Sequence, residues 1–340
     1  MKSLHTTQSD CAPMIRNTES TSFSRSILKL GAGLMIAVAM AATSHAQTIL
    51  VADPNGSNGV SSYNIDGTLI NSSLINLSGA SPTYFEGLAL SGSTLYVAKT
   101  GAPSVGVYTL NGAGGVSSSG TSVYGGGMTG LTTPYGLAVT ATNLFITSFN
   151  NGDVFKYDFS GNQLASIYVG LTNPYGLAVS GNTLWVSQAT TGTGLNTIKG
   201  YSISTFSNTP TFTLTSDLSL PHGLAVSGNT VFVANGGNGT ISSFNATTGT
   251  SNGVLVSGLT GPQGITVFGS SLFVTGSDGT VKGFDASTGL ALAGFTTITG
   301  LSSPYGIVVT EVPEPATFAA LAGATILGFA ALKRRRRAIV

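Results

Sequence analysis

A phrase of the form Pro-x-Gly followed by an apolar run recurs along the whole central part of the chain. Its six copies are PTYFEGLAL (82–90), PYGLAV (134–139), PYGLAV (174–179), PHGLAV (221–226), PQGITV (262–267) and PYGIVV (304–309). The first copy has three extra residues before its glycine, and successive glycines are 49, 40, 47, 41 and 42 residues apart. A period of about 40–50 residues is typical of propeller blades, which have four strands each. The repeat therefore predicts a series of similar β-sheets.

Each repeat contains further strand patterns after the phrase. A short turn such as Ser180-Gly181-Asn182 is followed by a second apolar run, and Gly and Asn tolerate the positive φ that a tight hairpin needs. These second runs are LYVA (95–98), LFIT (144–147), LWVS (184–187), VFVA (231–234) and LFVT (272–275). A third run places an aromatic residue three positions after Val or Ile, as in Val154 and Tyr157. Apolar runs of this kind predict strands that are covered on both faces, as stacked blades would be.

The two ends of the repeat region complement each other. Residues 49–67 contain a second and a third strand without a preceding Pro-x-Gly phrase, whereas 304–309 form a first strand with nothing after it. Joined, they complete one blade and remove the exposed sheet edges. An open β-solenoid, the competing architecture, would not leave complementary fragments. We therefore predict an all-β, six-bladed propeller over residues 47–311, closed by joining its N- and C-terminal strands.

The blade pattern resembles the NHL repeat, and more widely the six-bladed propellers that include the SMP-30/gluconolactonase-like group. The resemblance covers roughly Thr48 to Thr310 and depends on the Pro-x-Gly phrase, the turn and the Gly-x-Val-x-x-Tyr strand. It implies the fold. It does not choose a function, because this fold carries hydrolases, lyases and binding platforms.

The residue before each repeat glycine varies, although the phrase around it does not. In such a propeller the first strand is innermost, and glycine at its start lets six backbones approach the axis. The preceding side chain should then face the mouth of the central channel. We call these six residues the central ring: Glu86, Tyr135, Tyr175, His222, Gln263 and Tyr305.

Two interpretations of the central ring remain open. In one, the ring is a polar, aromatic pocket for a sugar-like ligand or a divalent metal, with Glu86 and His222 as weak metal candidates. The gluconolactonase-like resemblance implies acidic and amide metal ligands before these glycines; Glu86 fits, but tyrosines and a histidine occupy other places. Pro-His-Gly at 221–223 also resembles streptogramin-lyase-like propellers. In the other, the tyrosines plug the channel and His222 is structural.

The enzyme interpretation lacks a complete set of groups. A catalytic divalent site usually has three protein ligands, and a third, such as Gln263 or an aspartate from a loop, would have to converge on Glu86 and His222. No catalytic constellation is recognisable, so we predict no catalytic residue and no required cofactor, with a divalent metal as the open alternative.

Charge and cysteine content exclude several other classes. Only 7% of the 340 residues are charged, and residues 47–312 hold four basic and nine acidic residues, a balance of −5. So few cations could not neutralise many phosphates, and we predict no nucleic-acid partner. The single cysteine, Cys11, lies near the N-terminus, so the repeat region has no disulfide or thiolate site.

Residues 1–46 have the pattern of a signal peptide. Arg25 and Lys29 precede the apolar stretch LGAGLMIAVAMAA (30–42), and Ser44-His45-Ala46 provides small residues at positions −3 and −1 of a cleavage site after Ala46. An uncleaved N-terminal anchor is the alternative. The pattern predicts export.

Residues 312–340 predict a second targeting segment. Pro313-Glu314-Pro315 is followed by 17 apolar or small residues (316–332), Lys333 and the basic run Arg334, Arg335, Arg336 and Arg337. The apolar stretch is at the lower limit for a transmembrane helix, and the arginines should stay in the cytoplasm. This order resembles the PEP-CTERM sorting signal, which implies an exosortase-type sorting enzyme as partner in a Gram-negative bacterium, removal of the helix, and delivery to the cell surface or exopolysaccharide matrix. A plain membrane anchor is the alternative.

These patterns together predict an exported surface protein whose propeller is a binding or interaction platform for extracellular polysaccharide or envelope protein. The alternative is a metal-assisted hydrolase or lyase, of the gluconolactonase-like or streptogramin-lyase-like kind, with its site at the channel mouth.

Overall fold

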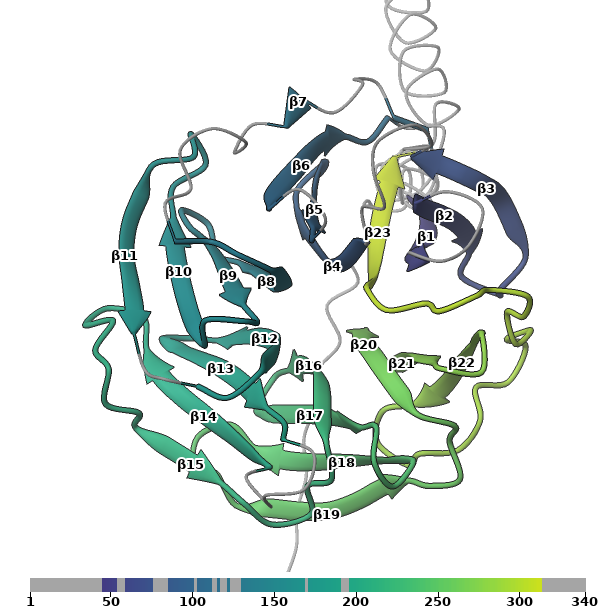
Figure 1. Cartoon of the computed structure of the whole chain (residues 1–340). Coiled ribbons are helices and arrows are strands. Elements are labelled where there is room, and N and C mark those ends of the chain that lie inside the picture. The colour runs from purple at the N-terminus through teal and green to yellow at the C-terminus, as the bar shows by residue number, and fades with distance from the viewer. Residues whose placement is uncertain are drawn as a thin grey trace, which may run out of the picture. The chain divides into compact units, whose positions relative to one another are not determined.

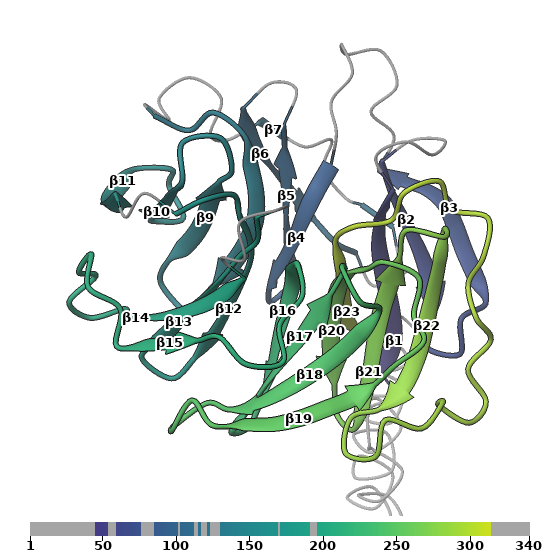
Figure 2. The same ribbon diagram turned by 60° about the horizontal axis from the view of Figure 1, so that its bottom comes forward.

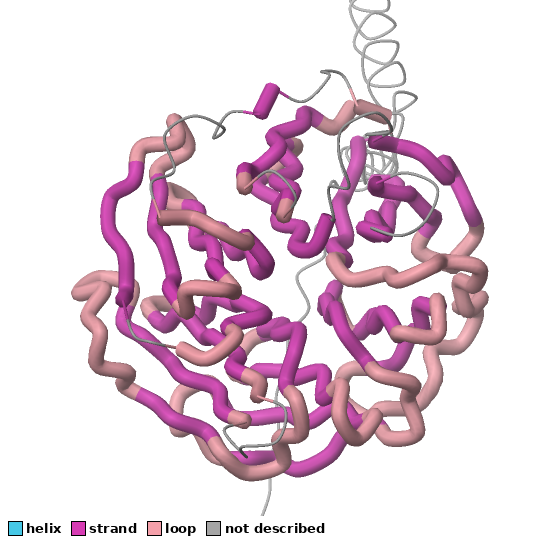
Figure 3. The backbone as a smooth tube through the Cα atoms, viewed as in Figure 1, coloured by secondary structure: helices cyan, strands magenta, loops and turns pink. Residues whose placement is uncertain are grey.

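The structure is a computed structural model that describes residues 45–53, 59–75, 85–100, 103–111, 115–116, 121–122, 130–168, 171–190 and 196–313. These residues form strands, turns and loops and contain no helix, and hence none able to cross a membrane (Figure 3). The predicted signal peptide, apart from His45 and Ala46, lies outside the described residues. So does the predicted sorting segment, apart from Val312 and Pro313.

Six sheets surround a common centre, as the repeat predicts. Figures 1 and 2 show the inner strands gathered at the centre and the outer strands at the periphery. From the inside outwards, the first three blades are β23 (Ile307–Pro313), β1 (His45–Asp53), β2 (Gly59–Asn64), β3 (Leu69–Ile75); β4 (Phe85–Ser91), β5 (Thr94–Lys99), β6 (Ser104–Thr109), β7 (Thr121–Ser122); and β8 (Pro134–Val139), β9 (Leu144–Ser148), β10 (Asp153–Tyr157), β11 (Gln163–Tyr168). The other three are β12 (Pro174–Ser180), β13 (Thr183–Gln188), β14 (Thr197–Ser202), β15 (Phe212–Leu214); β16 (Pro221–Ser227), β17 (Thr230–Asn235), β18 (Thr240–Asn245), β19 (Ser251–Val256); and β20 (Pro262–Phe268), β21 (Ser271–Gly276), β22 (Thr280–Asp285).

The first blade combines the two ends of the repeat region, and this part of the prediction is confirmed. β23 pairs with β1 in antiparallel register from His45 opposite Pro313 to Val51 opposite Ile307. The described unit begins and ends at this blade. β1 starts two residues before the predicted mature N-terminus, and Pro313, assigned to the sorting motif from sequence, ends β23.

The core lies between neighbouring blades. Six clusters of buried apolar residues each combine side chains from two adjacent blades, and the sixth joins Phe273 of the last blade to Ile49 of the first. The aromatic residues of the third strands are buried here, as Tyr157 and Tyr201 illustrate with no exposed surface. Face-to-face packing therefore covers both sides of each sheet, which explains why the middle strands are apolar on both faces.

The sixth blade is less regular than the repeat predicts. Its sheet has three strands, and the segment after β22 adds only isolated bridges, from Ala291 to Phe284 and from Ile298 to Val281. This outer segment lacks the alternating apolar pattern of a half-buried strand, and its residues 293, 294, 296 and 297 are exposed.

Candidate functional site

Five of the six inner strands contain a β-bulge at their central ring residue. In β8, Pro134 pairs with Ser148 and Leu137 with Ile146, so Tyr135 and Gly136 lie in a one-residue register shift. β4, β12, β16 and β20 shift at the same place. A bulge bends a strand and redirects its side chains. Here it turns the variable residue of the phrase towards the axis.

The repeat glycines pack against the ring residues of the next blade. A Cβ on Gly87 would overlap the carbonyl oxygen of Tyr135, and one on Gly136 would overlap that of Tyr175. The same relation continues around the axis until Gly306 faces the carbonyl oxygen of Glu86. The predicted reason for glycine, close approach of six backbones, is thus confirmed, and the six ring residues are held in a closed circle by their own main chain.

Hydroxyl side chains reinforce this circle in three blades. Gly136 N donates to Thr147 Oγ1 at 2.7 Å, and the same hydroxyl donates to the Tyr175 carbonyl at 3.0 Å. Ser187 connects Gly176 N to the carbonyl of His222, and Thr275 connects Gly264 N to that of Tyr305. Sequence reasoning missed these bridges. The sequence signal for these bridges was the final Thr or Ser of LFIT, LWVS and LFVT, because the other blades have alanine at this position.

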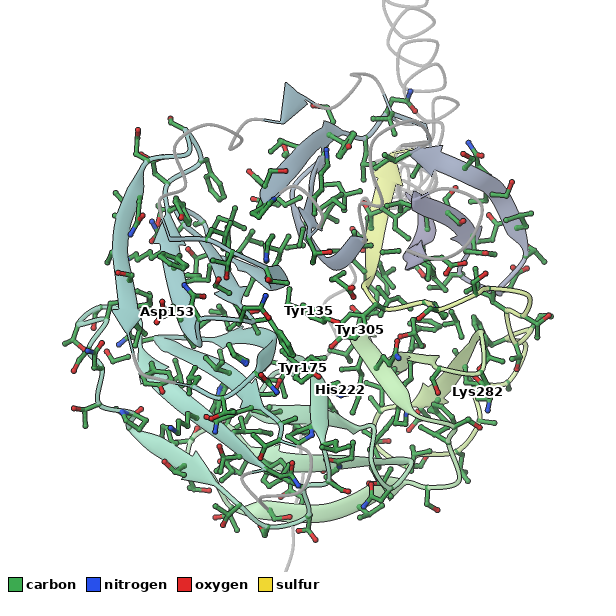
Figure 4. The ribbon with its side chains drawn as sticks, in the orientation of Figure 1. Tyr135, Asp153, Tyr175, His222, Lys282 and Tyr305 are labelled. Carbon is green, nitrogen blue, oxygen red and sulfur yellow. The ribbon has the colours of Figure 1, made fainter. Side chains whose placement is uncertain are left out.

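Aromatic rings lie at the centre of the propeller (Figure 4). Tyr135 meets Tyr175 and Tyr305 edge-to-face, with ring centroids 5.3 and 5.1 Å apart. Phe149, which follows β9, packs 5.1 Å from Tyr135 and 5.0 Å from Tyr175. The His222 ring lies 4.4 Å from that of Tyr175 and 6.2 Å from that of Tyr305. Four of the six predicted residues are therefore linked by contacts between neighbouring rings near the axis.

Glu86 joins this cluster as a buried carboxyl group. It is 8% exposed, and the Tyr135 hydroxyl donates a hydrogen bond to it. Burial raises the pKa of Glu86 to about 7, an effect that the Tyr135 hydrogen bond partly offsets. The Tyr135 pKa is raised by burial and by the neighbouring carboxylate. The carboxyl group therefore changes charge near neutral pH.

Three other residues of the central ring hold polar atoms without hydrogen-bond partners. The His222 imidazole donates a hydrogen bond to the Pro262 carbonyl. Burial lowers the pKa of His222 to about 4, so the imidazole is neutral at pH 7. His222 Nδ1, Gln263 Oε1 and the Tyr305 hydroxyl are buried and unpartnered. Buried polar atoms of this kind commonly bind ordered water.

The central ring provides few side chains that could bind a metal. Among the described residues, no three His, Cys, Asp or Glu side chains come together closely enough to hold one. Glu86 and His222 could contribute one ligand each, but Tyr175 packs against the imidazole and Tyr135 hydrogen-bonds to the carboxylate. A metal at this place would have to displace the ring contact on His222 and the hydrogen bond on Glu86.

Sequence reasoning did not foresee a cavity between the first and sixth blades. It measures about 570 Å³ and lies between β1, β2 and β3 of the first blade and residues 297–302 of the sixth. Asp53, at the end of β1, accepts backbone N–H bonds from Ser302 and Ser303 at 2.9 and 2.8 Å. We call this space the seam cavity, because it lies where the first and last blades meet. The available sequence signal was Asp53 itself. The strands equivalent to β1 in other blades end instead at Lys99, Ser148 or Asn235.

Comparisons with known proteins support the architecture alone. No protein-family profile and no curated protein sequence matches the chain. Among solved structures, a chain in the crystal structure of the nidogen/laminin complex is 18% identical with a TM-score of 0.64, over 77% of this chain and 98% of that one. The computationally designed Ika8 protein is 19% identical over 78% of each chain, with a TM-score of 0.45. At these identities the likeness to the nidogen/laminin chain shows the fold: the protein is an all-β, six-bladed propeller.

Proposed function

We propose that this protein is exported to the surface or matrix of a Gram-negative bacterium, where its propeller binds extracellular polysaccharide or envelope protein without catalysis. The observation that carries the proposal is the packing of Tyr135, Tyr175 and Tyr305 at the axis. With these aromatic side chains packed at the axis, the proposal places binding on the faces and blade junctions of the propeller. A body with four basic and nine acidic residues in 266 positions, and many hydroxyl and amide groups, favours neutral ligands.

Two sequence resemblances extend this proposal. The blade pattern assigns the propeller to the NHL-like group, and residues 312–340 act as a PEP-CTERM-type signal that an exosortase-type enzyme recognises. In this scheme the C-terminal helix anchors the chain until sorting releases it.

The platform function is tested with the fragment 45–316, which contains every described strand and all six core clusters. We expect the fragment to co-sediment with exopolysaccharide from the producing bacterium, or to crosslink to envelope proteins on intact cells. An unrelated propeller with similar charge is the control. Failure to bind either material above that control would contradict the platform function.

Sorting is tested separately in a host with an exosortase-type enzyme. Replacing Pro313, Glu314 and Pro315 together by alanine should leave unprocessed chain in the membrane fraction. A control replacement of Thr317, just beyond the motif, should leave processing unchanged. If the triple variant is processed like the unaltered chain, these residues are not the sorting motif.

A second candidate function, metal-assisted hydrolysis or elimination, is favoured by one observation: the Glu86 pKa of about 7 is suited to proton transfer at neutral pH. Metal analysis of the fragment after dialysis tests it, with Glu86→Ala/His222→Ala beside it. Stoichiometric metal that disappears in the double variant would favour the enzyme. Absence of metal in both would remove this candidate.

A further inference from the structure

The seam cavity is framed by two anchors that tie the sixth blade to the first. At one end, Thr296 N donates to the Asp66 carbonyl at 2.7 Å. At the other, the Asp53 carboxylate holds the backbone N–H groups of Ser302 and Ser303. The segment between these anchors forms one wall of the cavity. Because both of its ends are fixed by hydrogen bonds, this wall is built before any ligand arrives.

Two irregularities create the space. β3 leaves register with β2 twice, so that Val60 pairs with Ile75 whereas Tyr63 pairs with Leu69. The sixth blade has no regular fourth strand to fill the junction. A second cavity, beside β20–β22, measures only about 10 Å³, roughly the space for one water molecule. By contrast, the seam cavity is within the range of about 300–1,000 Å³ that small-molecule sites occupy.

The lining combines hydroxyl groups with a few apolar surfaces. Five of the lining residues carry aliphatic hydroxyls: Ser61, Ser72, Thr297, Thr299 and Ser302. Tyr63, Leu69 and Leu301 add aromatic and aliphatic surface. Hydroxyls donate and accept hydrogen bonds, so this wall can match a ligand that itself carries many hydroxyls and also has C–H faces.

Charge narrows the class of ligand. Residues 47–98 and 283–312, which contain both walls, include no lysine and no arginine. The charged side chain in the lining is Asp53, which is 7% exposed and already bonded to two N–H groups. A carboxylate or sulfate ligand would find no countercharge here and would be repelled by Asp53. A neutral ligand meets no such cost.

We propose that the seam cavity is a binding site for neutral oligosaccharides, which contact hydroxyls of both the first and the sixth blade. This proposal rests on the platform function and deepens it, because it names the place and the chemical class of the ligand. A bound sugar bridges the two blades that close the ring, and therefore stabilises the folded propeller by binding it in preference to the unfolded chain.

The experiment titrates the fragment 45–316 with soluble probes: neutral trisaccharides of glucose, mannose and galactose, and a galacturonic acid trisaccharide as the charged comparison. Binding is followed by NMR and by melting. At least one neutral trisaccharide should saturate below about 10 mM, raise Tm by about 2–4 °C at roughly ten times Kd, and bind at least tenfold more tightly than the acidic one.

Three variants locate the site. Thr299→Trp places a bulky side chain on an exposed lining position and should weaken binding at least tenfold. Thr297→Val/Thr299→Val removes two hydroxyls without adding bulk and should weaken it severalfold, which guards against a misfolded tryptophan variant. Thr209→Trp, on an exposed turn before β15, is the matched control and should bind like the unaltered fragment.

The outcomes separate this proposal from the platform function. Neutral sugar binding that survives both cavity variants would overturn the seam site while leaving the platform function intact. Equal or tighter binding of the acidic trisaccharide, or no binding of any neutral probe, would also overturn it. Co-sedimentation with exopolysaccharide and crosslinking to envelope proteins by the same fragment then decide the platform function independently.

Discussion

Glu86 and His222 both belong to the central ring, and burial shifts their pKa values in opposite directions. The Glu86 pKa rises from 4.5 to about 7, so between these values the folded chain keeps a proton that the unfolded chain releases. The His222 pKa falls from 6.5 to about 4, so there the unfolded chain binds a proton that the folded chain does not. As pH rises, the first effect lowers the free energy of unfolding and the second raises it. Between pH 4.5 and 6.5 they oppose each other.

Single substitutions should reveal the two opposing effects. Relative to the unaltered fragment, His222→Gln should make the free energy of unfolding fall as pH rises from 4.5 to 6.5, because the Glu86 contribution is no longer balanced. Glu86→Gln should make it rise over the same range. Each change is on the order of 3 kcal/mol, from about 1.4 kcal/mol per pKa unit. Urea denaturation at several pH values measures it, and parallel curves for all three proteins would contradict it.

The repeat glycines are a second feature at this scale. Gly223→Ala would place a Cβ against the carbonyl oxygen of Gln263. This oxygen belongs to the backbone of the next blade, so the clash could be relieved only by moving the two blades apart. We expect a loss of about 3 kcal/mol or more in the free energy of unfolding. Gly228→Ala, in the turn after β16, has a φ of 54° and open space around it, and should cost only about 1–2 kcal/mol. Urea denaturation that finds equal losses would show that the backbone approach is looser than described.

At the scale of the strand, the inner bulges depend on side-chain hydroxyls in some blades. Thr147→Val keeps the shape of the side chain but leaves Gly136 N and the Tyr175 carbonyl without their partner. The expected loss is about 1–3 kcal/mol. Thr142→Val, on the exposed turn of the same blade, is the control and should change stability by less than about 0.5 kcal/mol. Denaturation curves that coincide for the two variants would remove the hydroxyl bridge as a stabilising element.

The strands differ in how well sequence predicts them, and burial is the reason. Middle strands such as β5 and β17 are covered on both faces, so their apolar runs identify them directly. Outer strands have little to bury: β3 is mostly exposed, and β7 has only two residues. Their patterns are accordingly weak, and the irregular end of the sixth blade could not be predicted. The central ring could be predicted because its residues occupy the one variable position of the Pro-x-Gly phrase. The seam cavity could not, because it depends on register shifts that no residue pattern encodes.

At the scale of the whole molecule, the ring is closed by a strand from the far end of the repeat region. β23 supplies the innermost strand of the first blade, and its approach segment supplies Tyr305 to the central cluster and Gly306 to the glycine circle. Without it, β1 would become an exposed sheet edge, and the first blade would lose the contribution of Ile307 to the apolar cluster around Phe273. Closure should therefore determine the stability of the whole propeller rather than of one blade.

The fragment 45–303, which lacks this strand, tests the dependence on closure. We expect it to aggregate or to unfold at much lower urea than 45–316, because six interblade cores are linked in one ring and the first blade is shared by two of them. A synthetic peptide of residues 304–313 should restore cooperative unfolding by adding back the missing strand, and a scrambled peptide should not. Gel filtration and urea denaturation report both results. If 45–303 is monomeric and as stable as 45–316, the pairing of β1 with β23 does not hold the ring together, and each blade must be stable through its sequential neighbours alone.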